Sequence, residues 1–419
     1  KIPKKSFFTC PKPESIQTPI LDSLMNNART LTIMGWLLAG VGISHAQGLL
    51  SIGNTTDDYD TDIPLTWTLS GTVGWDDNVG STNDDEVDSF YVQAGVGARY
   101  AGGSRVTRYS LGASFSILWY DEEVQSKVNG RPVGDSEDLF YNARVSFTVV
   151  HRVSRRLNIS NNAYIAYEIE PDHDIGASRT RRTDQYVYGY NRFSVRYAWT
   201  RRVSTVASYA LSWINYDDSG SARDDRLLHL FSLQGRYLYN RTTTLTTSYR
   251  FGYTDYDSRE SSKKHYFLVG AEHAFSRVTR GDLNIGLNIR DDAAGTDTGP
   301  FVEGSIVHQQ TEKLTLRGVV RYGFEDGELG SYDSRESFRL GFNAIYEFTP
   351  RLRGSAGITY VHTEYSDADG LILRPDGQIE RIGDGDEDYF GFNLGVSYLL
   401  YNNVRLNAGY SYTTYDSGR

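Results

Sequence analysis

The sequence has very little of what most small or soluble folds depend on. Among its 419 residues there are 1 cysteine, 10 prolines and 2 methionines. A single cysteine excludes an intrachain disulfide framework and a zinc site built from several cysteines. Basic residues are outnumbered, with 43 Lys and Arg against 53 Asp and Glu, and the net charge of −10 argues against a nucleic-acid-binding protein. The only long apolar run lies near the N-terminus, which excludes a bundle of membrane-spanning helices.

Glycine and tyrosine are abundant instead, with 41 and 31 residues, while apolar residues make up 39% of the chain. This combination is unusual for a packed soluble core, which is built mainly from aliphatic residues. It suits a chain whose segments have one apolar face and one face in water.

The N-terminal region predicts an export signal. Residues 1–24 show no structural pattern, and the chain does not begin with Met, so we interpret them as read-through or a fragment boundary, with Met25 as the start. Residues 25–46 have the parts of a secretory signal peptide. Arg29 supplies the positive charge, Leu31–Ile43 is an apolar stretch, and Ser44-His45-Ala46 is a small-x-small cleavage site.

A short membrane anchor is the alternative for this stretch, but about 13 apolar residues are too few to cross a bilayer core. We therefore expect cleavage after Ala46, with Gln47 as the mature N-terminus and residues 47–64 as a short periplasmic segment. Cys10 precedes the signal, so the mature chain would contain neither a cysteine nor a lipid anchor.

From residue 65 onward the sequence alternates apolar and polar residues at period 2, one segment after another. In Phe90–Tyr100 the even positions are Phe, Val, Ala, Val, Ala and Tyr, whereas the odd positions are Tyr, Gln, Gly, Gly and Arg. Phe338–Phe348 follows the same rule. Successive side chains of a strand point to opposite faces, so the two faces of these segments meet different surroundings. Segments of about ten residues match tilted strands that cross a bilayer better than the shorter strands of a soluble sandwich.

The connections between these segments alternate in length and charge. Short turns that are basic or neutral, such as Arg152–Arg155 and Thr200–Arg202, alternate with longer and mostly acidic loops, such as Asp76–Asp88 and Glu170–Asp184. Short periplasmic turns and long outer loops are typical of an outer-membrane barrel. The sequence therefore predicts an all-β fold over residues 65–419, a transmembrane antiparallel up-and-down β-barrel. We count about seventeen segments, which begin near residues 65, 90, 105, 138, 156, 185, 203, 227, 245, 265, 283, 301, 314, 337, 352, 389 and 404.

An odd count of strands has a consequence for closure. Bacterial single-chain barrels have an even number of strands, which returns both termini to the periplasm. The first and last segments here both run outward, so we expect a barrel of about 18 strands whose last, returning strand is missing from this chain. A barrel of this size encloses an aqueous channel. Residues 47–64 are too few for a plug domain, so a plug would have to come from an outer loop, of which residues 366–388 form the longest.

Tyrosine and tryptophan gather at the outer ends of the predicted strands. Their amphipathic rings belong at the level of the lipid headgroups. Ordinary β-propensity is the alternative, and it explains the abundance of these residues but not their position. We assign to an outer aromatic girdle Trp75, Trp119, Trp213, Tyr253, Tyr360 and Tyr412, accompanied at the same strand ends by Tyr120, Tyr216 and Tyr256.

Face parity places a set of charged residues inside the barrel. Basic side chains that line a pore favour anionic solutes, and facing acids create a transverse field. The alternative is that a wide barrel needs polar filler and that Arg–Glu pairs stabilise its wall. The excess of arginine predicts a mild preference for anions. The predicted pore-lining residues are Arg99, Arg144, Arg192, Arg196, Arg236, Arg250, Arg317, Arg321, Arg339 and Arg405, with Glu168, Glu303, Glu325 and Glu347.

Motifs for catalysis are missing. The sequence has no HExxH, no GxSxG elbow, no Walker A loop and no dinucleotide-binding glycine pattern. His229, His265 and His362 on rim strands are weak candidates, so we expect no enzyme, no cofactor and no metal centre. Acidic loop tips such as Asp84–Asp88 and Asp384–Asp388 either bind divalent cations that bridge lipopolysaccharide or are simply solvated.

Three kinds of motif carry a resemblance to a known family. They are the opening strand Gly71–Val79, the Tyr-Asp strand ends Asp255–Asp257 and Thr414–Asp416, and the Gly-Tyr-Ser-Tyr of residues 409–412. Together they resemble the putative β-barrel porin-2 family of bacterial outer-membrane β-barrel proteins, over roughly residues 65–419. The resemblance implies a barrel of about 16 to 18 strands without catalytic residues. Some members of that family sit in exopolysaccharide export loci, and the chain departs from the family by lacking a closing strand with a terminal aromatic residue.

Two functions from different classes follow. The first is a transport channel of the outer membrane, either a passive porin or the port of exopolysaccharide export, with the polymer passing lumenal arginines and Tyr186, Tyr188 and Tyr190. The alternative is a non-conducting structural or adhesive envelope barrel that displays acidic surface loops. The expected partners are outer-membrane lipid and lipopolysaccharide, the barrel assembly machinery and periplasmic proteins of polysaccharide export, with no nucleic acid.

Overall fold

A computed structural model of the chain describes residues 31–34, 64–79, 87–128, 131–169, 185–217, 225–257, 260–292, 295–326, 332–368, 371–373, 379–381, 385–401 and 404–417. Cys10, the predicted cleavage site and most of the long acidic loops lie outside these residues. The regular elements of the described part are strands. None of its residues belongs to a helix long and apolar enough to cross a membrane.

Seventeen strands of the described residues make up the barrel, as the sequence predicted. The first nine are β2 (Leu65–Asp76), β3 (Ser89–Gly103), β4 (Thr107–Val128), β5 (Arg131–Arg152), β6 (Leu157–Ile169), β7 (Gln185–Ala198), β8 (Val203–Tyr216), β9 (Arg226–Leu238) and β10 (Thr243–Tyr256). The other eight are β11 (Ser262–Ala274), β12 (Thr279–Asp292), β13 (Gly295–Gln309), β14 (Leu314–Asp326), β15 (Tyr332–Thr349), β16 (Leu352–Ala368), β19 (Gly385–Tyr401) and β20 (Val404–Ser417).

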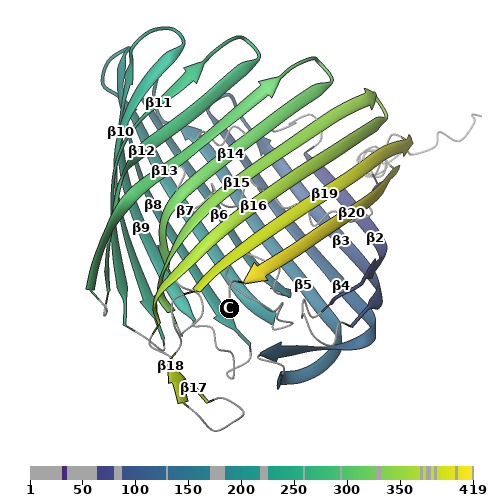
Figure 1. Ribbon diagram of the computed structural model, residues 1–419. Helices are drawn as coiled ribbons and strands as arrows, with labels where there is room; N and C mark the ends of the chain where they lie inside the picture. The colour runs from purple at the N-terminus through teal and green to yellow at the C-terminus, as the bar shows by residue number, and fades with distance from the viewer. Residues whose placement is uncertain are drawn as a thin grey trace, which may run out of the picture.

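Each barrel strand pairs antiparallel with its neighbour in the chain, so the topology is up-and-down throughout. The strands cross the cylinder at a tilt (Figure 1). A four-residue strand, β1 (Leu31–Met34), lies at the seam and pairs in parallel with both β2 and β20. A small hairpin of β17 (Leu371–Leu373) and β18 (Ile379–Arg381) stands apart from the barrel at its lower end in Figure 1. The expected eighteenth, returning strand stays a prediction.

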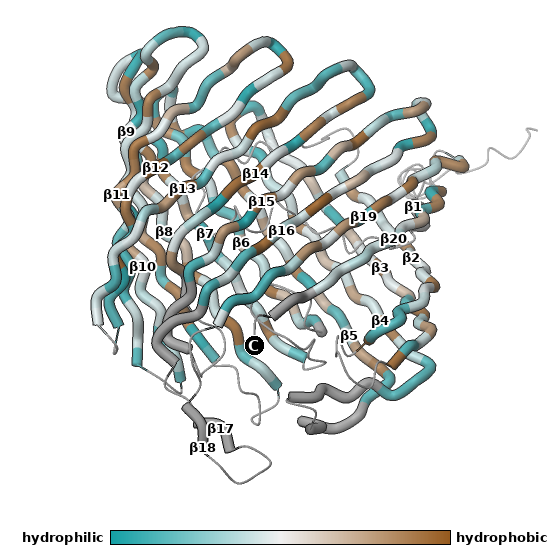
Figure 2. The backbone as a smooth tube through the Cα atoms, viewed as in Figure 1, coloured by the Kyte–Doolittle hydropathy of each residue, from teal (hydrophilic) through white to brown (hydrophobic). Residues whose placement is uncertain are grey.

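The alternation of the sequence becomes a division between two faces of the wall. On the outer face large apolar side chains stand exposed, with Val73 at 59% and Val269 at 58% of their full exposure. Their sequence neighbours, such as Thr72 and Leu268, face the lumen and are nine-tenths or more buried. Figure 2 shows the same alternation of apolar and polar residues along the strands. An exposed apolar band of this kind is unfavourable in water and is stabilised by contact with the acyl chains of a lipid bilayer.

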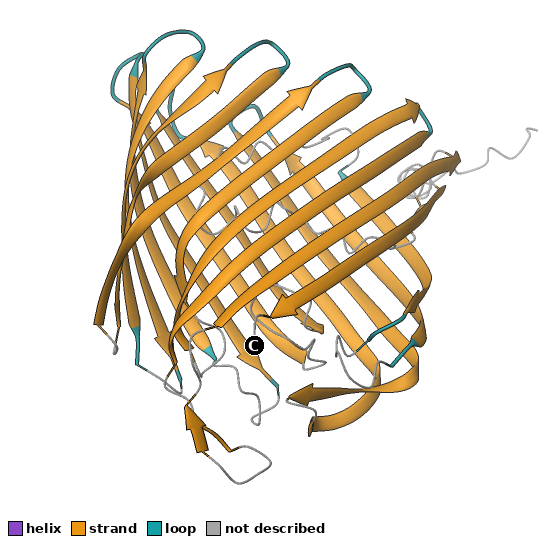
Figure 3. Cartoon of the chain, viewed as in Figure 1, coloured by secondary structure: helices purple, strands orange, loops and turns teal. Residues whose placement is uncertain are grey.

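Short turns close one end of the barrel and share one hydrogen-bonding motif (Figure 3, top). In the turn after β7 the hydroxyl of Thr200 accepts hydrogen bonds from the backbone N–H groups of Arg202 and Val203, at 3.1 and 3.0 Å. The side chain of Asn240 does the same in the turn after β9, at 2.8 Å for both bonds. Ser, Thr and Asn fix tight turns in this way. Ser104, Ser154, Ser276, Thr311 and Thr349 cap the corresponding turns.

The opposite end carries the longer connections, one of which reaches into the lumen. Val79 follows β2 and is 2% exposed, and its N–H donates a backbone hydrogen bond to Val87 at 2.9 Å. It packs with Leu118, Tyr120 and Phe140, whose positions on β4 and β5 face the lumen. Val79 therefore covers part of the wall from inside. Of residues 366–388, the longest of the predicted outer loops, the structure describes 366–368, 371–373, 379–381 and 385–388, which include the hairpin of β17 and β18.

We expect the two faces of one strand to respond oppositely to a charge. Ile358 of β16 faces outward and is 43% exposed, whereas Thr359 faces the lumen between Gly341 and Gly391. Ile358→Arg should lower the free energy of unfolding in phospholipid vesicles by about 2–4 kcal/mol, because arginine is costly on the lipid face near the midplane. Thr359→Arg is the matched control and should cost clearly less, because its charge stays in water. Equal losses in urea titrations would contradict this assignment of the faces.

Candidate functional site: the lumenal wall

The arginines that the sequence placed in the pore occupy lumenal positions of the wall. Arg144, for example, pairs in register with Ser114 and Ala166, between outward-facing Ala143 and Val145. Glu168, Glu303 and Glu347 share this face, and Glu325 lies in β14 with a side chain outside the described part. The lumenal arginines of that set are Arg99 on β3, Arg144 on β5, Arg192 and Arg196 on β7, Arg236 on β9, Arg250 on β10, Arg317 and Arg321 on β14, Arg339 on β15 and Arg405 on β20.

Two of these arginines are buried and held by carboxylates on nearby strands. Arg250 is 1% exposed, and its Nη1 donates a hydrogen bond to Oε2 of Glu303 at 3.0 Å while its Nη2 donates to Oε1. Arg236 makes a similar two-bond pair with Glu272 and also donates to Gln234 at 3.1 Å. Such fork-like pairs combine energy with fixed geometry. They reinforce the wall between β9 and β13.

Other lumenal arginines keep their charge available. Within the described part of the chain, neither Arg196, Arg317 nor Arg405 forms an ion pair. Arg196 and Arg317 are exposed and Arg405 is half-buried. An exposed guanidinium that no acid neutralises attracts anions in the adjacent water. The lumen therefore carries both structural ion pairs and positive charge that a solute can meet.

Aromatic rings form a second feature of the lumenal wall. The lumenal aromatic patch consists of Tyr164, Tyr188, Tyr190, Tyr266 and Phe301. The ring centroids of Tyr164 lie 5.6 Å from Tyr188 and 5.5 Å from Tyr190, and Tyr266 meets Phe301 edge-on at 5.1 Å. Tyr190, Tyr266 and Phe301 are buried, whereas Tyr164 and Tyr188 are only partly buried. The rings of Tyr164 and Tyr188 are therefore partly exposed on the lumenal face and pack against buried neighbours.

Arginine side chains lie over this patch. The guanidinium carbon of Arg144 is 4.4 Å from the ring centre of Tyr164, and that of Arg321 is 5.8 Å from the ring centre of Phe301. Cation–π contacts of this kind orient the guanidinium without consuming its hydrogen bonds. A flat apolar ring beside a planar donor of hydrogen bonds suits a ligand that has an apolar face and a carboxylate.

The lumenal face also holds rings that the sequence assigned elsewhere. Tyr120, Tyr216 and Tyr256 were expected beside the outer girdle, and the structure shows that this was wrong. Each lies an odd number of residues from its girdle companion, so the period of 2 turns it to the opposite face. Tyr120 packs against Phe140 at 6.0 Å inside the barrel. The odd spacing between each of these tyrosines and its girdle residue could have shown this from the sequence alone.

The six girdle residues occupy outward-facing positions. Trp75, Trp213, Tyr253 and Tyr412 lie toward the long-loop ends of β2, β8, β10 and β20, whereas Trp119 and Tyr360 lie near the middle of the longer strands β4 and β16. A second set of exposed rings lies at the opposite rim, in or beside the short turns, and the sequence analysis missed it. It consists of Trp199, Tyr239, Phe275, Phe348 and Tyr401. Two belts of rings at the two ends of the wall are typical of a barrel in a bilayer.

The three candidate histidines lie on the outer face and are bonded to neighbours. His229 and His265 interact through Nδ1 with the hydroxyls of Tyr209 and Tyr249, at 2.8 and 2.9 Å. His362 lies 3.0 Å from Asp388 through its Nδ1. Across the described ranges, no three His, Cys, Asp or Glu side chains gather closely enough to hold a metal ion. The histidines do not converge on a common centre.

Comparison with known proteins identifies the family. Residues 65–419 match the family described as putative beta-barrel porin 2. The chain belongs to this family. It is accordingly a porin-like β-barrel of the outer membrane, and the resemblance read from its sequence is confirmed. No curated protein is similar enough in sequence to count as a match.

Solved structures with a similar overall arrangement are outer-membrane transporters and receptors of low sequence identity. The FrpB iron transporter from Neisseria meningitidis (F3-3 variant) is 10% identical, with a TM-score of 0.43 over 78% of this chain and 60% of that one. The copper transporter OprC is 10% identical, with a TM-score of 0.42 over 84% and 63%. A mutant of the ferric enterobactin receptor PfeA from Pseudomonas aeruginosa is 11% identical, with a TM-score of 0.42 over 85% and 62%. The chain spans less than two thirds of the length of each.

We expect the two classes of lumenal ion pair to differ in their effect on stability. Glu303→Gln leaves the buried charge of Arg250 without a counter-ion and should cost about 3–5 kcal/mol of unfolding free energy. Glu347→Gln is the matched control, because its partner Arg353 is 57% exposed and Glu347 itself 44%. Its loss should stay below about 1 kcal/mol. Urea titrations of both variants in vesicles measure the difference, and a Glu303→Gln barrel as stable as the control would refute the structural role of this pair.

Proposed function

We propose that this barrel is a water-filled channel that passes anionic solutes, and saccharides with carboxylate groups in particular. The observation that carries the proposal is the combination of unpaired lumenal arginines with partly buried tyrosine rings on one wall. A ring of seventeen strands is wide enough to leave an aqueous interior, since about 16 to 18 strands do so in porins. Arginine binds carboxylates in a planar, two-bond geometry, and an aromatic face supports the apolar face of a sugar.

The finer proposal is that the solute is an acidic polysaccharide on its way out of the cell. A polymer needs a continuous series of weak sites rather than one tight site, because it must keep moving. Arg144 above Tyr164 and the partly buried Tyr188, whose ring lies 5.6 Å from that of Tyr164, supply weak sites of this kind on the wall. The partners would then be periplasmic proteins of polysaccharide export, besides outer-membrane lipid, lipopolysaccharide and the barrel assembly machinery. A cleaved signal peptide would bring the chain across the inner membrane.

A non-conducting envelope barrel is the second candidate, and one observation favours it. Val79 packs against Leu118 and Phe140 from inside the barrel, on the side of the longer connections, and so occupies part of the lumen there. In that case the barrel would display its acidic loops without transport. The family description names a porin rather than an enzyme, and the geometry of the lumenal wall supports no catalytic step.

We expect conductance to decide between these functions. The purified barrel in planar bilayers should form open pores, and under a salt gradient the reversal potential should shift toward that of the anion, because unpaired arginines dominate the lumenal charge. A silent barrel would refute the channel and favour the envelope role. A firm cation preference would refute the anionic solute while leaving the channel in place.

The lumenal tyrosines should affect a saccharide more than a simple ion. Tyr164→Ala and Tyr188→Ala should each raise the concentration of an oligogalacturonate that halves the current by about three- to tenfold, the effect of losing one stacking partner. Tyr209→Ala and Tyr249→Ala are the controls, because both rings lie on the outer face. Chloride conductance should change little in all four variants. Equal sensitivity of inner-face and outer-face variants would contradict a saccharide path along this wall.

A further inference from the structure

Lumenal arginines recur at the short-turn end of the barrel in a regular way. The turns at residues 104–106, 153–156, 199–202 and 239–242 each lie within four residues of one lumenal arginine. These are Arg108 on β4, Arg152 on β5, Arg196 on β7 and Arg236 on β9. Register confirms the face, since Arg108 pairs with lumenal Gly103 and Arg152 with lumenal Asn158.

The remaining four short connections repeat the arrangement. Residues 275–278, 310–313, 350–351 and 402–403 are each accompanied, again within four residues, by one lumenal arginine. These are Arg280 on β12, Arg317 on β14, Arg353 on β16 and Arg405 on β20. Every short turn therefore contributes one arginine to the mouth. We call these eight residues the mouth arginines. Four of them, at positions 108, 152, 280 and 353, were not recognised in the sequence.

The face that the mouth arginines occupy separates them from a general enrichment of basic residues at the rim. On the strands as described, no Lys or Arg occupies an outward-facing position within four residues of a short turn. Those outward positions hold residues such as His151, His273 and Thr279 instead. If basic residues were enriched at this rim only to orient the barrel in the membrane, we would expect arginine on both faces of the strands. A lipid-facing arginine near the interface can extend its charged end into water.

The mouth has a positive excess. Glu272 pairs with Arg236 and Glu347 pairs with Arg353, while Asp282 accepts a hydrogen bond from Ser305. Eight arginines less these three acids leave five positive charges on the lumenal face at this level. Among the residues that the structure describes, no acid forms an ion pair with the other six mouth arginines. A ring of one charge sign at a pore entrance selects and concentrates the opposite sign.

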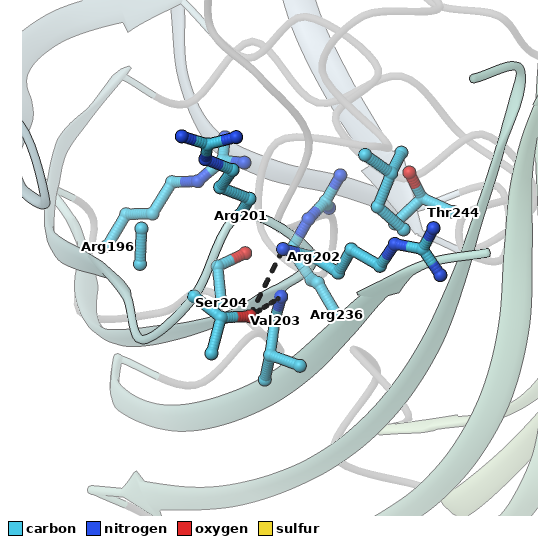
Figure 4. Close-up of a pocket in the computed structure, with 10 residues that line it drawn as sticks. Arg196, Arg201, Arg202, Val203, Ser204, Arg236 and Thr244 are labelled. Carbon is cyan, nitrogen blue, oxygen red and sulfur yellow. Dashed lines mark hydrogen bonds between the residues drawn. The ribbon is translucent and has the colours of Figure 1, made fainter. Parts of the chain in front are cut away.

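Two mouth arginines, Arg196 and Arg236, line the same pocket, which Figure 4 shows. They line it together with Arg201 and Arg202 of the turn between β7 and β8, and its cavity of about 140 Å³ has no acidic residue in its lining. The buried Nε of Arg236 has no hydrogen-bond partner anywhere in the described chain. The hydroxyl of Thr200 fixes the turn by accepting from the N–H groups of Arg202 and Val203 (Figure 4). A site of this shape and charge suits a carboxylate or phosphate group.

We infer that the mouth arginines form a capture ring for an acidic polysaccharide that enters from the periplasm. Short turns mark the periplasmic end of such barrels, so the ring lies at the periplasmic entrance. Its charges face the lumen at the entrance that a polymer chain would pass. The inference rests on the proposed function, because it assigns the substrate class and the side of entry to the same lumen.

The test compares two fourfold variants with the same loss of charge. The ring variant replaces Arg108, Arg152, Arg280 and Arg317 with Gln. The turn variant replaces Arg105, Arg155, Arg241 and Arg277 with Gln, all of them in the adjacent short turns. Polygalacturonate is added to either side of single channels in planar bilayers. Orientation is read from the side on which an impermeant thiol reagent labels Glu312→Cys, in a chain that also carries Cys10→Ser.

In the wild type, periplasmic polygalacturonate should halve the current at a concentration at least tenfold lower than outer polygalacturonate. The ring variant should raise the periplasmic value at least tenfold, whereas the turn variant should change it less than threefold. A version of the ring variant with Lys instead of Gln should keep most of the block, which separates lost charge from a folding defect. Neutral dextran should show no dependence on either variant.

Several results would overturn the inference. Block that is equal from both sides, or lost equally in the ring and turn variants, is incompatible with a lumenal ring at the periplasmic mouth. Block that is lost only in the turn variant would place the polyanion's contacts in the turns outside the lumen and would refute the ring. If the barrel does not conduct, calorimetric titration of the detergent-purified protein with polygalacturonate decides. Binding that the ring variant loses supports the capture ring while refuting transport, and binding that it keeps refutes the ring.

Discussion

Hydrogen bonding of the backbone in lipid is the constraint on which the rest of this structure depends. A bilayer core offers no partner for an N–H or C=O group, so strands can cross it only when each is paired on both sides in a closed cylinder. The up-and-down pairing meets this requirement for the strands from β3 to β19, whereas β2 and β20 each pair directly with one barrel strand, β3 and β19. At the seam, β1 pairs in parallel with β2 and β20 over a few residues. It belongs to residues 25–46, the predicted signal peptide, so a chain cleaved after Ala46 would need another strand to pair these two edges.

The closed cylinder then dictates the chemistry of each strand. One side of every strand must be apolar, while the other meets water and neighbouring polar groups, so charges are cheap only inside. Even there the cost depends on burial: Arg250, at 1% exposure, needs the two oxygens of Glu303, whereas exposed Arg317 remains solvated without an ion pair. The lumenal wall is thus divided into ion pairs that hold β9 to β13 together and free charge that faces the solute.

Much of this architecture was predictable because the period of 2 is a strong signal. It gave the strand count, the alternation of turns and loops, and the positions of residues such as Arg144 and Trp119 along their strands. It failed where a short distance in sequence was taken for a shared face, as with Trp213 and Tyr216. The lumenal aromatic patch was not predictable, because Tyr164, Tyr266 and Phe301 meet only through the pairing of five intervening strands. The aromatic rings at the short-turn rim were not predictable either. In the sequence Tyr239 and Phe275 resemble ordinary turn residues, and only the position of the strands in the membrane shows that they lie at the level of the lipid headgroups.

The axial distribution of lumenal charge adds an argument about direction. At the short-turn end the positive charges exceed the negative, whereas the opposite end mixes carboxylates such as Asp76, Glu168 and Glu387 with basic residues such as Arg226 and Lys264. A fixed field of this form lowers the barrier for an anion at the periplasmic entrance and offers no matching attraction at the exit. It cannot drive net flux, because a static field leaves the equilibrium between the two sides unchanged. On the proposed function, such a field makes entry of an anionic polymer from the periplasm faster than re-entry from outside at low concentration, so that the supply of polymer in the periplasm would set the direction of transport.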